Sequence, residues 1–178
     1  MSEKNDVYSD VKGQMRLSER IAAFIPGFRG YKEKEIRRES DRLIRNHLYL
    51  KLSTEKNDLR EISQQLSDRR YFDVLTDMDR LIAKMDRVVE KVNHASYGYG
   101  GFFDAVKVKE DSLDRMIEFD NKLMDNINAL ATEIAAFKAD LTSGNTSNLK
   151  SRVQSVTDKL ESLEDTFDQR NEVISGAS

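Results

Sequence analysis

The chain contains no cysteine, and its 178 residues include a single proline, Pro26. Without cysteine there is neither a disulfide framework nor a thiolate that could bind a metal ion or act as a nucleophile. One proline is too few for a loop-rich chain, and 38% hydrophobic residues is too high a fraction for a disordered one. These absences favour one domain built from long helices.

Long hydrophobic runs are also missing. No window approaches the roughly 18 apolar residues that a membrane-spanning helix needs, and the N-terminal MSEKNDVYSD is polar, so we expect a cytoplasmic protein. The net charge is −3, but residues 1–70 carry 16 basic against 12 acidic residues, and residues 71–178 carry 13 against 20. This imbalance favours an anionic partner for the N-terminal part, yet it is far from the strongly basic character of a nucleic-acid-binding domain.

Hydrophobic periodicity predicts five helices, over residues 11–25, 32–66, 71–94, 111–141 and 147–174. Residues 1–10 and 175–178 are expected to be disordered. Each helix has one narrow apolar stripe, and such helices are not stable singly in water. We therefore predict an all-α fold in a single domain of residues 11–174: an antiparallel four-helix bundle with coiled-coil-like packing and a short N-terminal helix.

The helix expected over residues 71–94 has the most regular apolar pattern. Its apolar residues alternate at spacings of three and four, as in a coiled-coil seam: Leu75, Met78, Ile82, Met85, Val89 and Val92. The helix before it combines a stripe of Ile44, Leu48, Leu52, Leu59, Ile62 and Leu66 with a set that recurs every seven residues, Ile36, Leu43 and Leu50. Asp111 is the expected N-cap of the helix over residues 111–141.

The stripe of residues 32–66 loses its register at its end, because its continuation falls on polar residues. A turn is therefore expected at residues 67–70, with Ser67 and Asp68 as N-cap types for the next helix. The alternative is one very long helix over residues 32–93, which the broken register argues against.

Charged residues occupy three positions at which the helical period predicts a hydrophobic residue: Asp120, Glu55 and Arg170. An unpaired buried carboxylate is costly, so Asp120 should face the edge of the bundle or meet a lysine, an arginine or a hydroxyl from another helix. Arg170 is one candidate partner for either acid, unless it reaches water near the end of its helix. A role for Asp120 in helix register is favoured over one as general base or metal ligand.

The sequence carries little that indicates catalysis. Neither His47 nor His94 follows a glutamate at the Glu-x-x-His spacing of carboxylate-bridged metal bundles. Glu90 and His94 share a helix face, but a pair at the helix end is favoured over a metal site. The glycine-rich GYGGFF does not follow a strand, which argues against a phosphate loop. We expect no enzyme activity, no cofactor, no metal ion and no small-molecule substrate.

Two segments combine aromatic residues with charges or glycines. FIPGFRGYKEKEIRRESDRLIR suits an anionic membrane surface or an acidic protein, and its interspersed acids also suit a salt-bridged surface. SYGYGGFF is expected to reverse the chain between two helices, where its aromatics either cap the bundle core or form a binding tip. The candidate interaction residues are Phe24, Ile25, Phe28, Arg29, Tyr31, Arg37, Arg38, Tyr97, Tyr99, Phe102 and Phe103.

Two stretches, IPGFRGYKEKEIRRESDRLIR at residues 25–45 and YGYGGFFDAVKVKEDSLDRMIEFDNKL at residues 97–123, resemble an uncharacterised group of short helical proteins of bacteria and archaea. The resemblance covers about a quarter of the chain and implies no activity and no catalytic residues. The chain is also loosely similar to coiled-coil membrane-remodelling proteins of the phage-shock and ESCRT-III type, which likewise pair a basic amphipathic first helix with a long hairpin. Those proteins have longer uninterrupted helices, and their hairpin has no glycine-aromatic loop.

These patterns predict a cytoplasmic, non-catalytic helical protein that acts through protein–protein contacts, as an adaptor, assembly partner or self-associating scaffold. The alternative is peripheral association with an anionic membrane surface through the N-terminal helix and IPGFRGYK. Nucleic acid is not an expected partner. The apolar seams suit packing within one chain and packing in an oligomer equally well.

Overall fold

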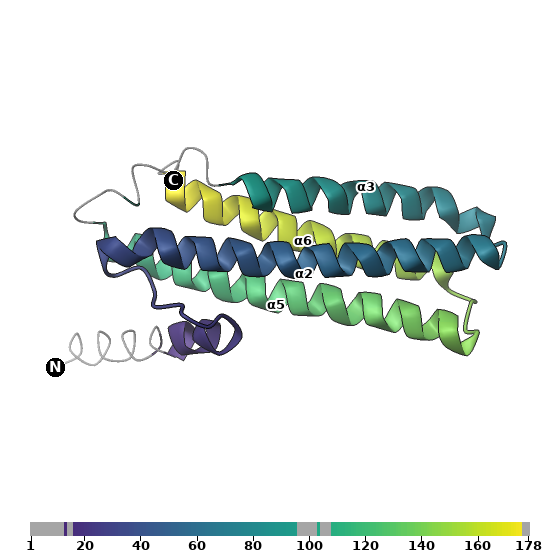
Figure 1. The fold of residues 1–178 in the computed structure, drawn as a ribbon, viewed down its shortest axis with the longest axis horizontal. Coiled ribbons are helices and arrows are strands. Elements are labelled where there is room, and N and C mark those ends of the chain that lie inside the picture. Colours follow the sequence, from purple (N-terminus) through teal and green to yellow (C-terminus); the bar gives the residue numbers. More distant parts are fainter. Residues whose placement is uncertain (1–12, 14–15, 96–102, 104–107, 176–178) are drawn as a thin grey trace. The chain divides into compact units, whose positions relative to one another are not determined.

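The computed structural model describes residues 13, 16–95, 103 and 108–175, and all regular secondary structure among these residues is helical (Figure 1). The prediction of an all-α fold is confirmed to this extent. A short helix covers residues 16–24. The long helices are α2 (Lys34–Asp68), α3 (Phe72–His94), α5 (Glu110–Ser143) and α6 (Leu149–Ser175), with bounds within two residues of the predicted ones. Of the segments predicted to be disordered, 1–10 and 176–178 lie outside the described residues, and Ser175 is instead the last residue of α6.

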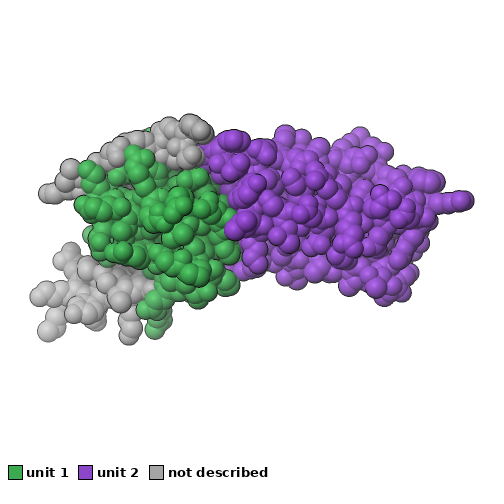
Figure 2. Space-filling model, in the orientation of Figure 1, with its two compact units in different colours: residues 1–47, 96–124, 166–178 green, residues 48–95, 125–165 purple. Residues whose placement is uncertain are grey.

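The chain forms two compact units (Figure 2). Unit 1 comprises residues 1–47, 96–124 and 166–178, and unit 2 comprises residues 48–95 and 125–165. Helices α2, α5 and α6 each contribute residues to both units. The single domain predicted from the sequence stays a prediction.

Apolar side chains fill the interior of each unit. The stripes that the periodicity predicts for the last two helices are buried: Leu113, Met116, Leu123, Ile127, Leu130, Ile134, Phe137 and Leu141 in α5, and Leu149, Val153, Val156, Leu160, Leu163, Phe167 and Ile174 in α6. In α2 the buried stripe is Ile44, Leu48, Leu52, Leu59, Ile62 and Leu66. Burial of each such side chain contributes about 1.5–3 kcal/mol. The set in α2 that recurs every seven residues lies outside this stripe, since Leu50 is 65% exposed.

The seam predicted for α3 is correct only in part. Met78, Met85, Val89 and Val92 are buried, but Leu75 and Ile82 are half-buried. The pattern missed Val74, Leu81 and Val88, which are buried. Ion pairs connect α3 to both α2 and α6 in unit 2. A helix with two neighbours buries a wider face than a narrow coiled-coil seam.

Helices α2 and α3 are separate, and a tight turn joins them. Arg70 has a φ of 64°. The N–H of Tyr71 donates to the carbonyl of Leu66 (2.9 Å) and that of Arg70 to the carbonyl of Ser67 (3.0 Å), which are the two hydrogen bonds of a Schellman motif. The N-cap prediction is therefore wrong: Ser67 and Asp68 end α2, and Tyr71 precedes α3 without a side-chain cap.

The turn between α5 and α6 repeats the same motif. Gly144 has a φ of 78°. The N–H of Asn145 donates to Asp140 (2.9 Å) and that of Gly144 to Leu141 (3.3 Å). The two turns lie together in unit 2, because the Arg69 guanidinium donates to the carbonyl of Leu141. Both turns thus satisfy the last carbonyls of the preceding helix.

Helix α5 begins one residue earlier than its predicted cap. Glu110 is its first residue, so Asp111 lies in the first turn and is not the N-cap. Both carboxylates are close to the positive end of the helix dipole, which stabilises them. The N-cap prediction for Asp111 is therefore wrong.

Ion pairs connect the helices on the surface of unit 2. Lys138 of α5 contacts Asp58 and Glu61 of α2 at 3.1 and 2.6 Å. Further pairs are Lys56–Asp86 between α2 and α3, Lys91–Glu164 between α3 and α6, and Arg152–Glu133 and Arg152–Asp140 between α5 and α6. Exposed pairs contribute roughly 0.2–1 kcal/mol each, so their main effect is on which helices become neighbours.

Candidate functional site

A group of polar side chains is buried in unit 1, and we call it the buried polar cluster: Tyr31, Asp41, Asp120 and Arg170. Tyr31, Asp120 and Arg170 are 0% exposed and Asp41 is 2% exposed. Tyr31 follows the IPGFRG loop, and the other three residues belong to α2, α5 and α6 respectively. Segments that are far apart in the sequence therefore meet at this cluster.

Arg170 is the centre of the cluster. Its Nε donates to Oδ1 of Asp120 (2.6 Å), one terminal nitrogen donates to Oδ1 of Asp41 (2.8 Å), and the other donates to the Tyr31 hydroxyl (3.0 Å). The Tyr31 hydroxyl in turn donates to Oδ2 of Asp120 (2.6 Å). The expectation that Asp120 meets an arginine or a hydroxyl is confirmed, and it meets both. The alternative that Arg170 reaches water is wrong.

Arg45 balances the remaining charge at the edge of the cluster. Its Nε donates to Oδ2 of Asp41 at 2.8 Å, and its side chain is 13% exposed. Two carboxylates, Asp41 and Asp120, are thus matched by two guanidinium groups, Arg45 and Arg170. Charge-assisted hydrogen bonds of this kind offset part of the large cost of removing ions from water.

The loop that carries Tyr31 is held against α2. The Ser40 hydroxyl donates to the carbonyl of Gly30 (2.7 Å), and Nε of Arg37 donates to the carbonyl of Tyr31 (2.8 Å). Gly30 has a φ of 82°, which few other residues adopt. The Phe28 ring packs edge-on against the Tyr31 ring, with 5.7 Å between centroids. The segment is therefore part of the interior of unit 1.

The protonation states follow from burial and from the neighbouring charges. Burial, with the Asp120 carboxylate beside it, raises the pKa of Tyr31 well above its ordinary value of 10. Burial also raises the pKa of Asp120, although Arg170 and the Tyr31 hydroxyl act in the opposite direction. Burial acts to lower the pKa of Arg170, but Asp120 and Tyr31 outweigh it and raise that pKa. Tyr31 thus keeps its proton and Arg170 its charge.

The cluster has no surface on which to act on a ligand. Its four side chains are at most 2% exposed, and their hydrogen-bonding groups are directed at one another. A general base needs hydrogen-bond reach to its substrate, which sealed side chains do not have. The arrangement can hold the loop and the helices of unit 1 together.

Some of the predicted interaction residues are buried and others are exposed. Ile25, Phe28, Tyr31, Arg37 and Phe103 are buried in unit 1. Phe24, Arg29 and Arg38 are exposed, and the Arg38 guanidinium lies 5.6 Å from the centre of the Phe103 ring. Tyr97, Tyr99 and Phe102 lie outside the described residues. Most of the apolar side chains of the IPGFRGYK segment therefore face inward.

The other polar residues that the sequence singled out, Glu55, Glu90 and His94, are not members of the buried polar cluster. Glu55 is 8% exposed, and burial together with Asp58 raises its pKa. Arg170 binds Asp41 and Asp120, and among the described residues it forms neither a hydrogen bond nor an ion pair with Glu55. His94 and Glu90 form an exposed pair at 3.0 Å on the last turns of α3. Within the described part of the chain, no three histidine or acidic side chains gather as metal ligands would.

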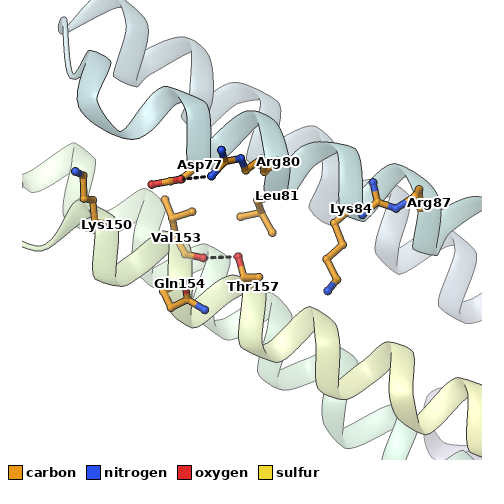
Figure 3. Close-up of a pocket in the computed structure, with 9 residues that line it drawn as sticks. All are labelled: Asp77, Arg80, Leu81, Lys84, Arg87, Lys150, Val153, Gln154 and Thr157. Carbon is orange, nitrogen blue, oxygen red and sulfur yellow. Dashed lines mark hydrogen bonds and ion pairs between the residues drawn. The ribbon is translucent and has the colours of Figure 1, made fainter.

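A basic groove lies between α3 and α6 in unit 2, and we call it the α3–α6 groove (Figure 3). It has a volume of about 300 Å³. Four basic side chains line it over an apolar floor of Leu81 and Val153: Arg80, Lys84, Arg87 and Lys150. Figure 3 shows Lys84 extending from α3 towards α6, whereas Arg87 stays beside α3.

Three of the four cations that line the α3–α6 groove have an acidic partner, among them Lys150, which lies 4.0 Å from Asp73. Lys84 bonds to Glu161 across the groove. Arg80 lies 3.4 Å from Asp77, and its side chain is 78% exposed. Arg87 has neither an ion pair nor a hydrogen bond with any residue that the structure describes. Sequence reasoning missed this site, although the spacing of Arg80, Lys84 and Arg87 places them on one helix face.

Comparisons of this chain with protein-family models, with curated proteins and with solved structures give no match. None of the described helices combines the length and the apolar character needed to cross a bilayer.

Proposed function

We propose that this protein is non-catalytic and acts through protein–protein contacts, as an adaptor or scaffold. The observation that carries the proposal is the α3–α6 groove, an exposed basic surface with an apolar floor and with Arg87 unpaired among the described residues. A partner with matching carboxylates gains ion pairs there and displaces little internal bonding.

A non-catalytic role also agrees with where the ionisable groups lie. The two buried acids of the cluster, Asp120 and Asp41, are bonded to Arg170 in a sealed interior. The groove itself holds cations, and Asp77 is the acid that lines it, already beside Arg80. A surface of this composition suits recognition by charge better than proton transfer.

For the fold of unit 2 we propose a four-helix bundle with mixed helix directions. Along α2 and α5, Lys138 contacts Glu61, and Leu141 bonds to Arg69 farther along both helices, which supports a parallel pair. For α3 and α6 the contacts Asp73–Lys150, Lys84–Glu161 and Lys91–Glu164 advance together, which supports a second parallel pair. The antiparallel neighbours are then α2–α3 and α5–α6.

This arrangement differs from the simple up-and-down bundle expected from the sequence. If α2 and α6 are the neighbours of α3, the next helix in the chain, α5, lies diagonally across the bundle. Consecutive helices still alternate in direction, so α3 and α5 are antiparallel but are not neighbours in the proposed bundle.

The proposed function is tested by comparing partners of the wild-type chain and of a groove variant. Proteins recovered under native conditions are identified by mass spectrometry for the wild type, for Arg80→Glu with Arg87→Glu, and for a control. The control is Arg115→Glu with Lys122→Glu, two exposed cations with the same spacing on α5. We expect partners that the control retains and the groove variant loses. Identical recovery with all three proteins would contradict the proposal.

Peripheral membrane association is the second proposal, and it rests on the exposed Phe24 (47%) near the exposed Arg29. It has less support, because Ile25 and Phe28 are 3% and 6% exposed in unit 1. Sedimentation with anionic vesicles tests it, with Phe24→Asp as the variant. Pelleting that salt and this substitution abolish would favour the membrane surface. The cytoplasmic location stays a prediction.

A further inference from the structure

We propose that unit 2 binds a second copy of this chain, with α3 of each copy against α6 of the other. The proposal rests on the proposed function of the α3–α6 groove as a protein-binding surface and names its partner. It follows from two stripes of opposite charge that lie side by side on one face of unit 2.

The two stripes have the same spacing. On α3, Arg80 and Arg87 are seven residues apart, and on α6, Asp158 and Asp165 are seven residues apart. All four side chains are exposed. Seven residues of α-helix rise about 10 Å, so each pair of charges covers the same length.

Both stripes lie on the outer side of the line where α3 and α6 meet. The contact of Lys84 with Glu161 marks that line. At 100° per residue, Arg80 and Arg87 lie beyond Lys84, on the side away from the buried residues of α3. Asp158 and Asp165 lie in the same way beyond Glu161, away from the buried residues of α6.

A two-fold axis parallel to the helices leaves each residue at the same level along the helix direction. It therefore brings the α3 stripe of one copy beside the α6 stripe of the other. Since Lys84 is level with Glu161 and α3 and α6 advance together, Arg80 is level with residue 157 and Arg87 with residue 164. The aspartates are each about one residue, or roughly 1.5 Å, from those levels. The axis therefore places Arg80 beside Asp158 and Arg87 beside Asp165 of the second copy. By symmetry the contact forms twice.

The charges are free to change partners. Arg87 and Asp165 have no ion pair or hydrogen bond among the described residues, and the Arg80–Asp77 pair is long and exposed. Asp158 accepts a hydrogen bond from Gln154 at 2.7 Å, which leaves its other oxygen available. Two of the exposed residues between the charges, Ala83 and Ser162, have short side chains that leave room for an approaching helix.

Charge reversal tests the proposal on the full chain. Sedimentation velocity and light scattering at about 0.05 M and about 0.5 M NaCl measure the dimer of the wild type, of R80E/R87E and of D158K/D165K. We expect a salt-sensitive wild-type dimer and a dissociation constant at least about tenfold higher for each reversed variant. R115E/K122E is the matched control and should dimerise like the wild type, and circular dichroism checks that each variant is folded.

The decisive measurement combines the two reversals. An equimolar mixture of R80E/R87E with D158K/D165K should form a heterodimer, because both symmetric contacts regain opposite charges. The chain with all four substitutions should form a homodimer again. Failure of both to restore the dimer would overturn the proposal, as would a wild-type dimer that neither reversal weakens.

A monomeric wild type would also overturn the second copy as the partner. If other proteins still require Arg80 and Arg87 for recovery, the groove remains a protein-binding surface and only this inference fails. If the wild type is monomeric and recovers no protein through the groove, the proposed function fails as well.

Discussion

Arg170 is a buried cation whose partners come from three other parts of the chain. Tyr31 belongs to the N-terminal loop, Asp41 to α2 and Asp120 to α5. Removing one member of a buried ionic group leaves the others charged and unpaired, which costs more than the intact group contributes. The cluster therefore ties the position of the loop to three helices of unit 1.

Replacing Arg170 with methionine leaves Asp41 and Asp120 without their shared cation. We expect the free energy of unfolding to fall by about 3–5 kcal/mol, measured by urea denaturation followed by circular dichroism. The control is Arg60→Met on α2, whose side chain is 54% exposed and which should change that free energy by less than about 0.5 kcal/mol. Equal effects of the two substitutions would show that the cluster contributes nothing specific.

Tyr31 makes stability sensitive to alkaline pH. Its pKa is raised in the folded protein, whereas in the unfolded chain it ionises near pH 10, as a free tyrosine does. The folded state therefore holds its proton more tightly, so this stabilisation is complete below about pH 10 and is lost as the pH rises towards the folded pKa. We expect the stability advantage of the wild type over Tyr31→Phe to shrink between about pH 9 and 11.

Urea titrations of both proteins at each pH measure this difference. The other tyrosines and the lysines contribute equally to the two proteins and cancel in the comparison. A constant difference across that pH range would mean that Tyr31 ionises as easily in the folded chain as in the unfolded one.

At the residue scale the sequence identified the charged positions but not their full set of partners. Asp120 and Arg170 interrupt apolar stripes, and that interruption is visible in the periodicity. Tyr31 lies before the helix and belongs to no apolar stripe. Asp41 is one of several acids in a charged segment. No local pattern shows that their side chains meet Arg170.

The two turns of unit 2 show how one motif is built from different residues. Both α2 and α5 end in a Schellman motif, with Arg70 and Gly144 at the position of positive φ. Glycine adopts this conformation without the steric cost that a side chain incurs. The arginine therefore places strain in the α2–α3 turn that the α5–α6 turn does not have.

Exchanging the residue types at the two turns should have opposite effects. We expect Arg70→Gly to raise the free energy of unfolding by about 0.5–1 kcal/mol and Gly144→Ala to lower it by about 1 kcal/mol. Thermal unfolding monitored by circular dichroism measures both. A loss of stability with Arg70→Gly would mean that contacts of the arginine side chain outweigh its backbone strain.

At the element scale the period of the apolar residues predicted the helices well. The stripes of α5 and α6 are buried as predicted, because each follows the helical repeat over many turns. The prediction was weaker for α3, where Leu81 and Val88 widen the buried face beyond the predicted seam. A second neighbour widens the buried face, and the pattern of a single helix does not reveal how many neighbours it will have.

For the whole molecule, the directions of neighbouring helices decide what its surface can recognise. In the proposed bundle α3 and α6 are parallel, and the contacts Asp73–Lys150 and Lys84–Glu161 share one register. The contact of Lys84 with Glu161 sets the register that places Arg80 near the level of Asp158 and Arg87 near that of Asp165. The proposed bundle and the proposed dimer therefore depend on the same feature.

Cysteine cross-linking tests these helix directions, because the chain has no cysteine of its own. We expect a short bismaleimide to join Glu61→Cys to Lys138→Cys, since these side chains are 2.6 Å apart between α2 and α5. The control pair is Glu61→Cys with Asp125→Cys at the beginning of the unit 2 part of α5. Mass spectrometry of the digest reads out both products. Efficient cross-linking of the control instead would indicate antiparallel helices.

The sequence by itself determined the helices, most of their buried faces and the need to satisfy charged residues within them, because these depend on period and on the cost of burying charge. Only the tertiary structure decided that Tyr31 and Asp41 join Arg170, and that cations of α3 lie beside acids of α6. Such contacts connect positions far apart in the chain, and local periodicity holds no information about which surfaces come together.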